Sequence, residues 1–72
     1  MNENFNQQET IENSQEYLII YFDPDNLWRW DYFRLVKEYA DGEVEWGLED
    51  HADGFTSFEE ARGVATDLYS IE

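Results

Sequence analysis

The stretch Asp41-Gly42-Glu43-Val44-Glu45-Trp46-Gly47-Leu48-Glu49 decides how this chain folds. Asp-Gly is a strong signal for a tight turn between two antiparallel strands, because glycine tolerates the positive φ that such turns require. After the turn, acidic and apolar residues alternate, which is typical of a strand with one face buried and the other in water. The stretch therefore predicts a β-hairpin whose last strand has an acidic outer face.

Two strands and a polar segment are expected before this stretch. Residues 16–22 are mostly β-branched or aromatic and predict a strand that is apolar on both faces. Residues 23–26, Asp-Pro-Asp-Asn, have the composition of a turn, and a second strand should run from residue 27 to about residue 39. We expect residues 1–15, whose main apolar side chains are Phe5 and Ile11, to form a flexible arm.

A helix is expected after the hairpin. Thr56 and Ser57 each have a glutamate three residues later, as in a capping box. Apolar residues then recur at helical spacing: Phe58, Ala61, Val64, Ala65, Leu68 and Ile71. The predicted fold class is α+β, a three-stranded antiparallel β-meander with one C-terminal helix packed on one face, and residues 16–72 form a single domain.

The predicted turn also fixes which residues face one another. A two-residue turn at Asp41-Gly42 places Glu38 opposite Glu45, and like charges in that position destabilise a sheet. Either the acidic face has a function that outweighs this cost, or the register differs from the simple one. The same register assigns to the core the face that carries Phe33, Leu35, Tyr39, Val44, Trp46 and Leu48.

The face occupied by the tryptophans of the second strand is ambiguous. With a four-residue turn at 23–26, Trp28 and Trp30 share a face with Tyr17, Ile19 and Tyr21 but lie opposite Phe33 and Leu35. A β-bulge near Asp31-Tyr32 would bring the two halves onto one core face. In the alternative, Trp28, Trp30 and Tyr32 form an exposed aromatic patch, which would make the protein a small interaction module without nucleic-acid mimicry.

Charge excludes several classes of function. Eighteen acidic residues against four basic ones give a formal net charge of −14 in 72 residues. Direct binding of nucleic acid needs lysine and arginine, so it is not expected, and neither is binding to an anionic membrane. The chain has no cysteine, no stretch typical of a signal peptide and no apolar run long enough to span a bilayer. These features favour a cytoplasmic protein.

Catalytic chemistry is not expected. The single histidine, His51, has neither a cysteine nor a second histidine to complete a metal site. The acidic segments that begin at Asp23 and Asp41 lack the glycine or glutamate that an EF-hand requires at fixed positions, and no glycine-rich phosphate loop is present. The sequence therefore predicts no enzyme activity, no cofactor and no metal.

The excess of acids is the feature that points to a function. Alternate residues of a strand project about 6.7 Å apart, a spacing that neighbouring phosphates of DNA approach because they wind around the axis. A basic DNA site could therefore accept such carboxylates in place of phosphates. The candidate partner-binding residues are Asp23, Asp25, Asp31, Glu38, Asp41, Glu43, Glu45, Glu49, Asp50 and Asp53.

In its length, its acid-to-base ratio, its lack of cysteine and its acid-lined segment from Asp41 to Asp53, the chain resembles small phage-encoded inhibitors of bacterial defence. That class includes anti-CRISPR and anti-restriction DNA mimics. The resemblance implies a basic nucleic-acid-binding protein or complex as the partner, in the bacterial cytoplasm. Leu18, Ile20 and the exposed strand edges make a weak homodimer possible beside a monomer. A weaker resemblance, through Trp28-Arg29-Trp30, Asp41-Gly42 and residues 54–57, is to YegP-type domains and implies the fold alone.

Overall fold

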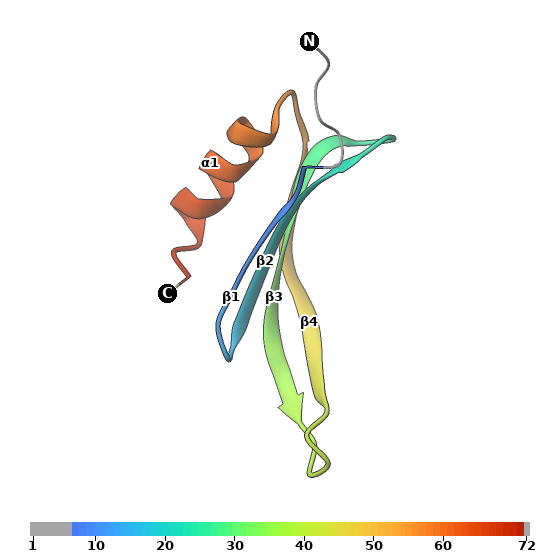
Figure 1. The fold of residues 1–72 in the computed structure, drawn as a ribbon, viewed down its shortest axis with the longest axis vertical. Coiled ribbons are helices and arrows are strands. Elements are labelled where there is room, and N and C mark those ends of the chain that lie inside the picture. The colour runs from blue at the N-terminus through green and yellow to red at the C-terminus, as the bar shows by residue number, and fades with distance from the viewer. Residues whose placement is uncertain (1–6, 72) are drawn as a thin grey trace.

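The fold is a four-stranded antiparallel meander followed by one helix that packs on the sheet (Figure 1). The computed structural model describes residues 7–71. The strands lie side by side in chain order: β1 (Glu9–Glu12), β2 (Glu16–Asp23), β3 (Leu27–Glu38) and β4 (Val44–Phe55), and α1 spans Phe58–Leu68. The α+β class is thus confirmed, but the sheet has four strands and not the predicted three.

The additional strand comes from the segment that we expected to be a flexible arm. Glu9–Glu12 pairs with β2, and Ile11 lies opposite Leu18 and packs against the core. Asn13 closes the turn to β2, because its side-chain oxygen accepts hydrogen bonds from the backbone N–H groups of Gln15 and Glu16, both at 2.8 Å. The arm prediction is therefore wrong for Glu9–Glu12, and the rest of that segment up to residue 6, with Phe5, lies outside the described residues.

The turn between β2 and β3 decides which face the tryptophans occupy. Its loop has three residues, 24–26, and Leu27 adopts a positive φ of 64° and pairs with Asp23. Trp28 consequently pairs with Phe22, and Trp30 pairs with Ile20. The expected four-residue turn would have placed both tryptophans with Tyr17, Ile19 and Tyr21. The loop is one residue shorter, so they lie on the opposite face.

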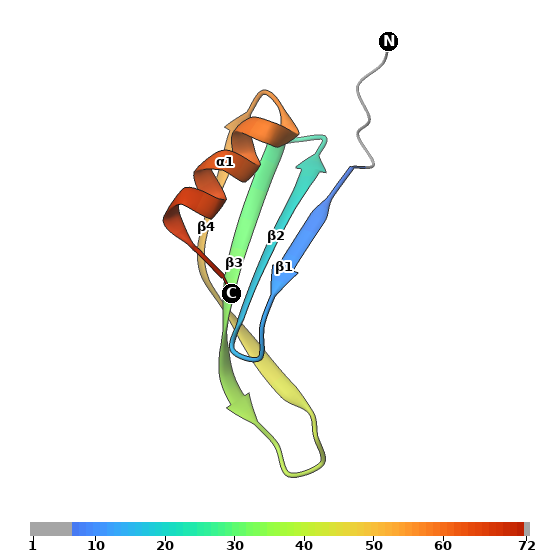
Figure 2. The ribbon, with the colours of Figure 1, turned by 60° about the vertical axis from the view of Figure 1, so that its left-hand side comes forward.

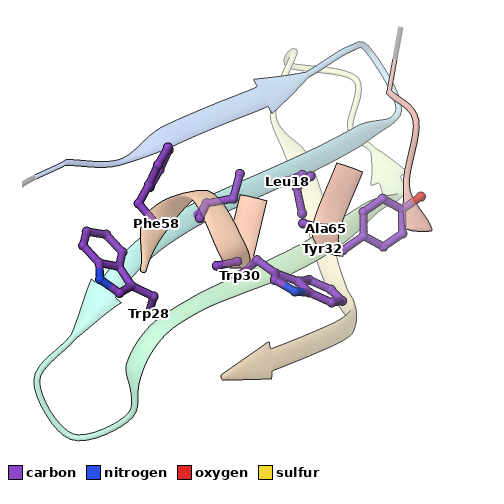
Figure 3. Close-up of a cluster of buried hydrophobic side chains, with 8 residues drawn as sticks. Leu18, Trp28, Trp30, Tyr32, Phe58 and Ala65 are labelled. Carbon is purple, nitrogen blue, oxygen red and sulfur yellow. The ribbon is translucent and has the colours of Figure 1, made fainter. Parts of the chain in front are cut away.

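The core lies between that face of the sheet and α1 (Figure 3). Its buried members from the sheet are Leu18, Ile20, Trp28, Trp30 and Tyr32, and from the helix Phe58, Ala61 and Ala65. Trp28 meets the ring of Phe58 edge-on, with a centroid distance of 5.7 Å. The predicted core face, with Phe33, Leu35, Trp46 and Leu48, is wrong: Phe33 alternates with the buried Tyr32 and so points away from the helix.

The predicted helix and its cap are confirmed. The Ser57 hydroxyl accepts a hydrogen bond from the Glu60 backbone N–H at 3.1 Å, and the Glu60 carboxylate accepts one from the Thr56 N–H at 2.9 Å. Arg62 joins the helix to β1 through Glu9, with a distance of 2.7 Å from Nε to Oε1. Within residues 7–71, no helix is long and apolar enough to cross a membrane.

The β3–β4 hairpin projects beyond the rest of the molecule (Figures 1 and 2). β2 begins at Glu16, opposite Arg34, so the part of β3 after Arg34 has β4 as its only neighbouring strand. The molecule is accordingly elongated, with principal extents of 48 × 22 × 18 Å. This projection carries Asp41-Gly42 and the first part of the acid-lined strand that follows it.

Candidate functional site

The tip of the hairpin is a three-residue loop. The Tyr39 N–H donates to the Glu43 carbonyl at 2.8 Å, and the Gly42 N–H donates to the Tyr39 carbonyl at 3.0 Å. Gly42 has a φ of 92°, and the Asp41 carboxylate accepts the Glu43 N–H at 3.0 Å. This arrangement is a type I turn followed by a glycine bulge. The predicted two-residue turn at Asp41-Gly42 is therefore wrong by one residue, Ala40.

The longer loop removes the predicted clash of like charges. Glu45 pairs with Lys37, and Glu38 pairs with Val44. Glu38 and Glu45 therefore project from opposite faces of the ribbon, because partners share a face and successive residues alternate. A bulge between Leu35 and Lys37 shifts the register once more, so that Leu35 pairs with Trp46 instead of Leu48. The pairing of Glu38 and Glu45 therefore gives no indication that the acidic face has a function.

Glu45 belongs to a small network on its own face of the hairpin. Its carboxylate accepts a hydrogen bond from the Tyr39 hydroxyl at 2.8 Å, which raises the pKa of that tyrosine. The Lys37 ammonium lies 4.8 Å from the centre of the Tyr39 ring, a cation–π distance. Glu45 thus stands beside a lysine and a tyrosine hydroxyl.

The acidic character of the projection remains. We define the acidic hairpin as residues 35–49, which contain five acids, Glu38, Asp41, Glu43, Glu45 and Glu49, and one base, Lys37. All five acidic residues are exposed. Glu49 is the unpaired residue of a bulge, since its neighbours Leu48 and Asp50 pair with Phe33 and Tyr32. The alternation that places Glu43 and Glu45 on one side of the ribbon is consequently interrupted at Glu49.

A second group of predicted residues lies at the other end of the sheet, around Arg29. The guanidinium of Arg29 bonds Asp31 at 2.6 Å and lies 3.9 Å from Asp23. The hydrogen bond with Asp31 raises the pKa of Arg29, and the charge of Asp53 adds to the effect. Asp25, in the adjoining turn, is exposed. The structure therefore separates the predicted site into two groups and does not bring them together.

Five of the ten predicted site residues accept hydrogen bonds within the fold: Asp41 and Glu45 in the hairpin, and Asp23, Asp31 and Asp50 outside it. Asp31 is 9% exposed and accepts hydrogen bonds from Arg29 and from the Tyr21 hydroxyl. Asp50 accepts the Tyr69 hydroxyl at 2.6 Å, which fixes the end of the helix segment to β4. Asp23 accepts bonds from the Asn26 side chain and the Asp25 N–H, and these lower its pKa. The carboxylates of Asp23, Asp31 and Asp50 therefore stabilise the fold through these hydrogen bonds.

The alternative aromatic site is not exposed. Trp28 and Trp30 are each 1% exposed and Tyr32 is 4% exposed. Tyr32 stacks on Tyr69 with a centroid distance of 3.8 Å, and its hydroxyl donates to Glu16 at 2.6 Å. The hypothesis of an aromatic patch formed by these three residues is therefore wrong, and they hold the helix on the sheet.

A different apolar surface was missed by the sequence analysis. We define the uncovered face as Tyr17, Ile19, Phe33, Leu35, Trp46 and Leu48, which lie on the side of the sheet opposite α1. The signal was present in residues 16–22, where both alternating sets are apolar although one helix can cover only one face. Tyr17 contacts Phe33 and Trp46 there, at centroid distances of 5.2 and 6.0 Å.

Neither a pocket nor a metal centre is seen in the part of the chain that the structure describes. Residues 7–71 form no cavity that could enclose a small ligand. No three histidine, aspartate or glutamate side chains within those residues are grouped so as to hold a metal ion. His51 is exposed in β4, opposite Asp31. The candidate site is therefore a surface.

Comparison with family models, with curated proteins and with solved structures finds no match for this chain.

Proposed function

We propose that the protein is an acidic DNA mimic that binds the positively charged nucleic-acid site of a bacterial defence effector and blocks binding of its target DNA. An RNA-guided surveillance complex is the leading class of partner, because its basic channel holds nucleic acid through the backbone. The observation that carries the proposal is the acidic hairpin, which has five exposed acids and one base and whose tip projects beyond β1, β2 and α1 (Figure 1).

The geometry of the hairpin supports insertion into a channel. A two-stranded ribbon is slender, and its carboxylates project from both faces, since Glu38 and Glu45 lie on opposite sides. A channel that surrounds a nucleic-acid strand would meet negative charge on each wall. Long-range attraction between the ribbon and such a channel would speed association and make it sensitive to salt.

The length of the molecule also fits a groove for duplex DNA. DNA rises about 3.4 Å per base pair, so the 48 Å extent corresponds to roughly 14 base pairs. The group of acids around Arg29 lies at the far end of the sheet from the hairpin tip. Asp25 and Asp53, the exposed members of that group, would extend the contact beyond the hairpin.

A matched pair of triple variants tests the proposal. The first replaces three hairpin acids: Glu38→Gln, Glu43→Gln and Glu45→Gln. The second replaces three exposed acids of the helix: Glu59→Gln, Glu60→Gln, which keeps an acceptor for the Thr56 N–H, and Asp67→Asn. Both change the net charge by the same amount. The assay is competition, by fluorescence anisotropy, for labelled target DNA bound to a guide-loaded Cas9-type complex and, separately, to a restriction endonuclease.

The hairpin triple variant should lose inhibition by a factor of about ten or more, since each lost charge contact is worth several-fold at low salt. The control variant should stay within about twofold of the parent protein. Equal losses in both variants would show that net charge alone is responsible and that the hairpin is not the site. Target DNA that stays bound in the presence of excess protein would refute the proposal for that effector.

A further inference from the structure

The uncovered face is an apolar surface that this chain does not bury among its described residues. Residues that alternate with the core members Leu18, Ile20 and Tyr32 point away from α1, and they are large and apolar where a one-layer sheet normally has polar side chains. Leu48, at its margin, is 53% exposed. The aromatic rings of Tyr17, Phe33 and Trp46 cover one another only in part, since each is half-buried.

The uncovered face lies at the base of the acidic hairpin and is continuous with it. Leu35, Trp46 and Leu48 belong to the hairpin itself, whereas Tyr17 and Ile19 come from β2. Glu12 and Glu38 point to the same side of the sheet, because Glu12 pairs with Tyr17 and Glu38 pairs with Val44, two residues from Trp46. An apolar centre with carboxylates at its margins is therefore presented as one surface.

Charge decides between the possible occupants of this surface. A second copy of the chain would bring another formal charge of −14 against the first, and both margins would repel. The basic side chain that faces this side among the described residues, Arg29, is already bonded to Asp31. A partner with lysine and arginine around an apolar patch would place positive charge against the carboxylates at the margins of this surface. Its apolar patch would cover the apolar centre.

We propose that the uncovered face is a docking surface for a protein whose own surface has an apolar centre and a lysine- and arginine-rich margin. The inference rests on the proposed function, because the basic partner of the acidic hairpin would supply this surface beside its nucleic-acid channel. The inhibitor then binds by two kinds of contact, in which the carboxylates steer and orient it and the apolar centre slows its dissociation.

Two synthetic 14-residue peptides serve as probes, one alternating lysine with leucine and the other alternating lysine with serine. They have the same charge and differ only in apolar area. Labelled peptide is titrated with the full chain at physiological salt, and anisotropy is measured. The variants are Leu48→Ser on the uncovered face and, as a matched control, Leu68→Ser on the helix, where the leucine is 59% exposed.

The lysine–leucine peptide should bind at least about tenfold more tightly than the lysine–serine peptide. Leu48→Ser should weaken binding of the lysine–leucine peptide about fivefold, because roughly half a leucine side chain remains to be buried there. It should leave the lysine–serine peptide unchanged, and Leu68→Ser should affect neither. Since both leucines are more than half exposed, thermal melting should show that both variants fold.

Equal affinity for the two peptides would overturn the inference and leave the proposed function standing as a matter of charge alone. Conversely, loss of peptide binding in Leu48→Ser together with unchanged DNA competition by the acidic triple variant would support this surface and refute the mimicry. A dimer in sedimentation equilibrium that Leu48→Ser dissociates would assign the face to a second copy instead. A Phe5→Ser variant with tenfold higher peptide affinity would assign it to the chain's own N-terminal segment.

Discussion

Replacement of Asp31 by alanine should destabilise this protein severely, although the sequence alone places Asp31 among the surface acids. The Asp31 and Arg29 side chains are 13% and 16% exposed and are joined at 2.6 Å. Removing one partner of a buried ion pair costs about 3–5 kcal/mol. We take the lower value, about 3 kcal/mol, because Asp23 lies 3.9 Å from the same guanidinium and compensates in part.

A domain of 72 residues has a free energy of unfolding of about 4–11 kcal/mol, so this loss is a large share of it. The melting temperature should fall by about 12–24 °C. In urea, where the slope for so small a domain is about 1 kcal/mol per molar, the midpoint should fall by about 3 M. Intrinsic tryptophan fluorescence measures the transition, and Asp25→Ala, an exposed acid in the neighbouring turn, is the control.

An Arg29→Met background separates the ion pair from the other contact of Asp31. There, Asp31→Ala should cost only about 1 kcal/mol, the value of the hydrogen bond from the Tyr21 hydroxyl. If Asp31→Ala shifts the urea midpoint no further than Asp25→Ala does, the ion pair between Asp31 and Arg29 does not stabilise the fold, and the prediction is refuted.

Three further predictions concern the helix cap and the dependence of stability on pH. Ser57→Ala removes the bond to the Glu60 N–H and should lower the melting temperature by about 4–8 °C, whereas Ser70→Ala beyond the helix should have little effect. Hydrogen bonds from Tyr32 and Asn13 lower the pKa of Glu16 below its usual 4.5, so its contribution is present above that value and is lost as the pH falls through the folded pKa. The difference in melting temperature between the parent protein and Glu16→Gln should therefore shrink below about pH 4.5, and a constant difference would contradict the assignment. Burial raises the pKa of Tyr21 and Tyr32 to about 12, so stability that is present below pH 10 should be lost toward pH 12, with tyrosinate absorbance rising in step with unfolding.

The pKa values of three carboxyl groups, Glu9, Glu16 and Asp23, are shifted in the direction opposite to that which the high negative charge suggests. Crowded carboxylates raise one another's pKa, which would make the protein more stable at mildly acid pH. Instead, the pKa values of Glu9, Glu16 and Asp23 are lowered, because each accepts hydrogen bonds: from Arg62, from Tyr32 and Asn13, and from Asn26 and Asp25. The elongated shape spreads the acids along 48 Å, and local partners then dominate at these three groups.

Local signals in the sequence led to correct predictions. The helix, its Ser57 cap and the buried positions of Phe58, Ala61 and Ala65 follow from spacing within a few residues. β1 was missed because Glu9–Glu12 has one large apolar side chain, Ile11, and its strand conformation depends on pairing with β2. No pattern within four residues can encode a partner that lies beyond the next turn.

The sequence predicted correctly which acidic residues of the hairpin are exposed, but it did not predict how the ten candidate residues are arranged in space. The five acids of the hairpin are exposed as expected, because a two-stranded ribbon leaves little room for burial. The positions of Asp23, Asp31 and Asp50 could not be foreseen, since each accepts a hydrogen bond from a residue that a turn or another segment brings near: Asn26, Tyr21 and Tyr69. The uncovered face could not be predicted either, because the sequence does not say which of the two alternating sets of side chains in each strand faces the helix.

The sequence by itself determined the charge of −14, the capped helix, the class of the fold and, to within one residue, the turns predicted at 23–26 and 41–42. Only the tertiary structure decided which side of each strand faces the helix. The reason is that side chains of a strand alternate with a period of two, so one residue more or fewer in a loop reverses every assignment that follows. Ala40 in the hairpin loop and Leu27 at a positive φ each supply such a change, and together with the bulges they bury Trp28 and Trp30 and leave Trp46 on the face without a helix.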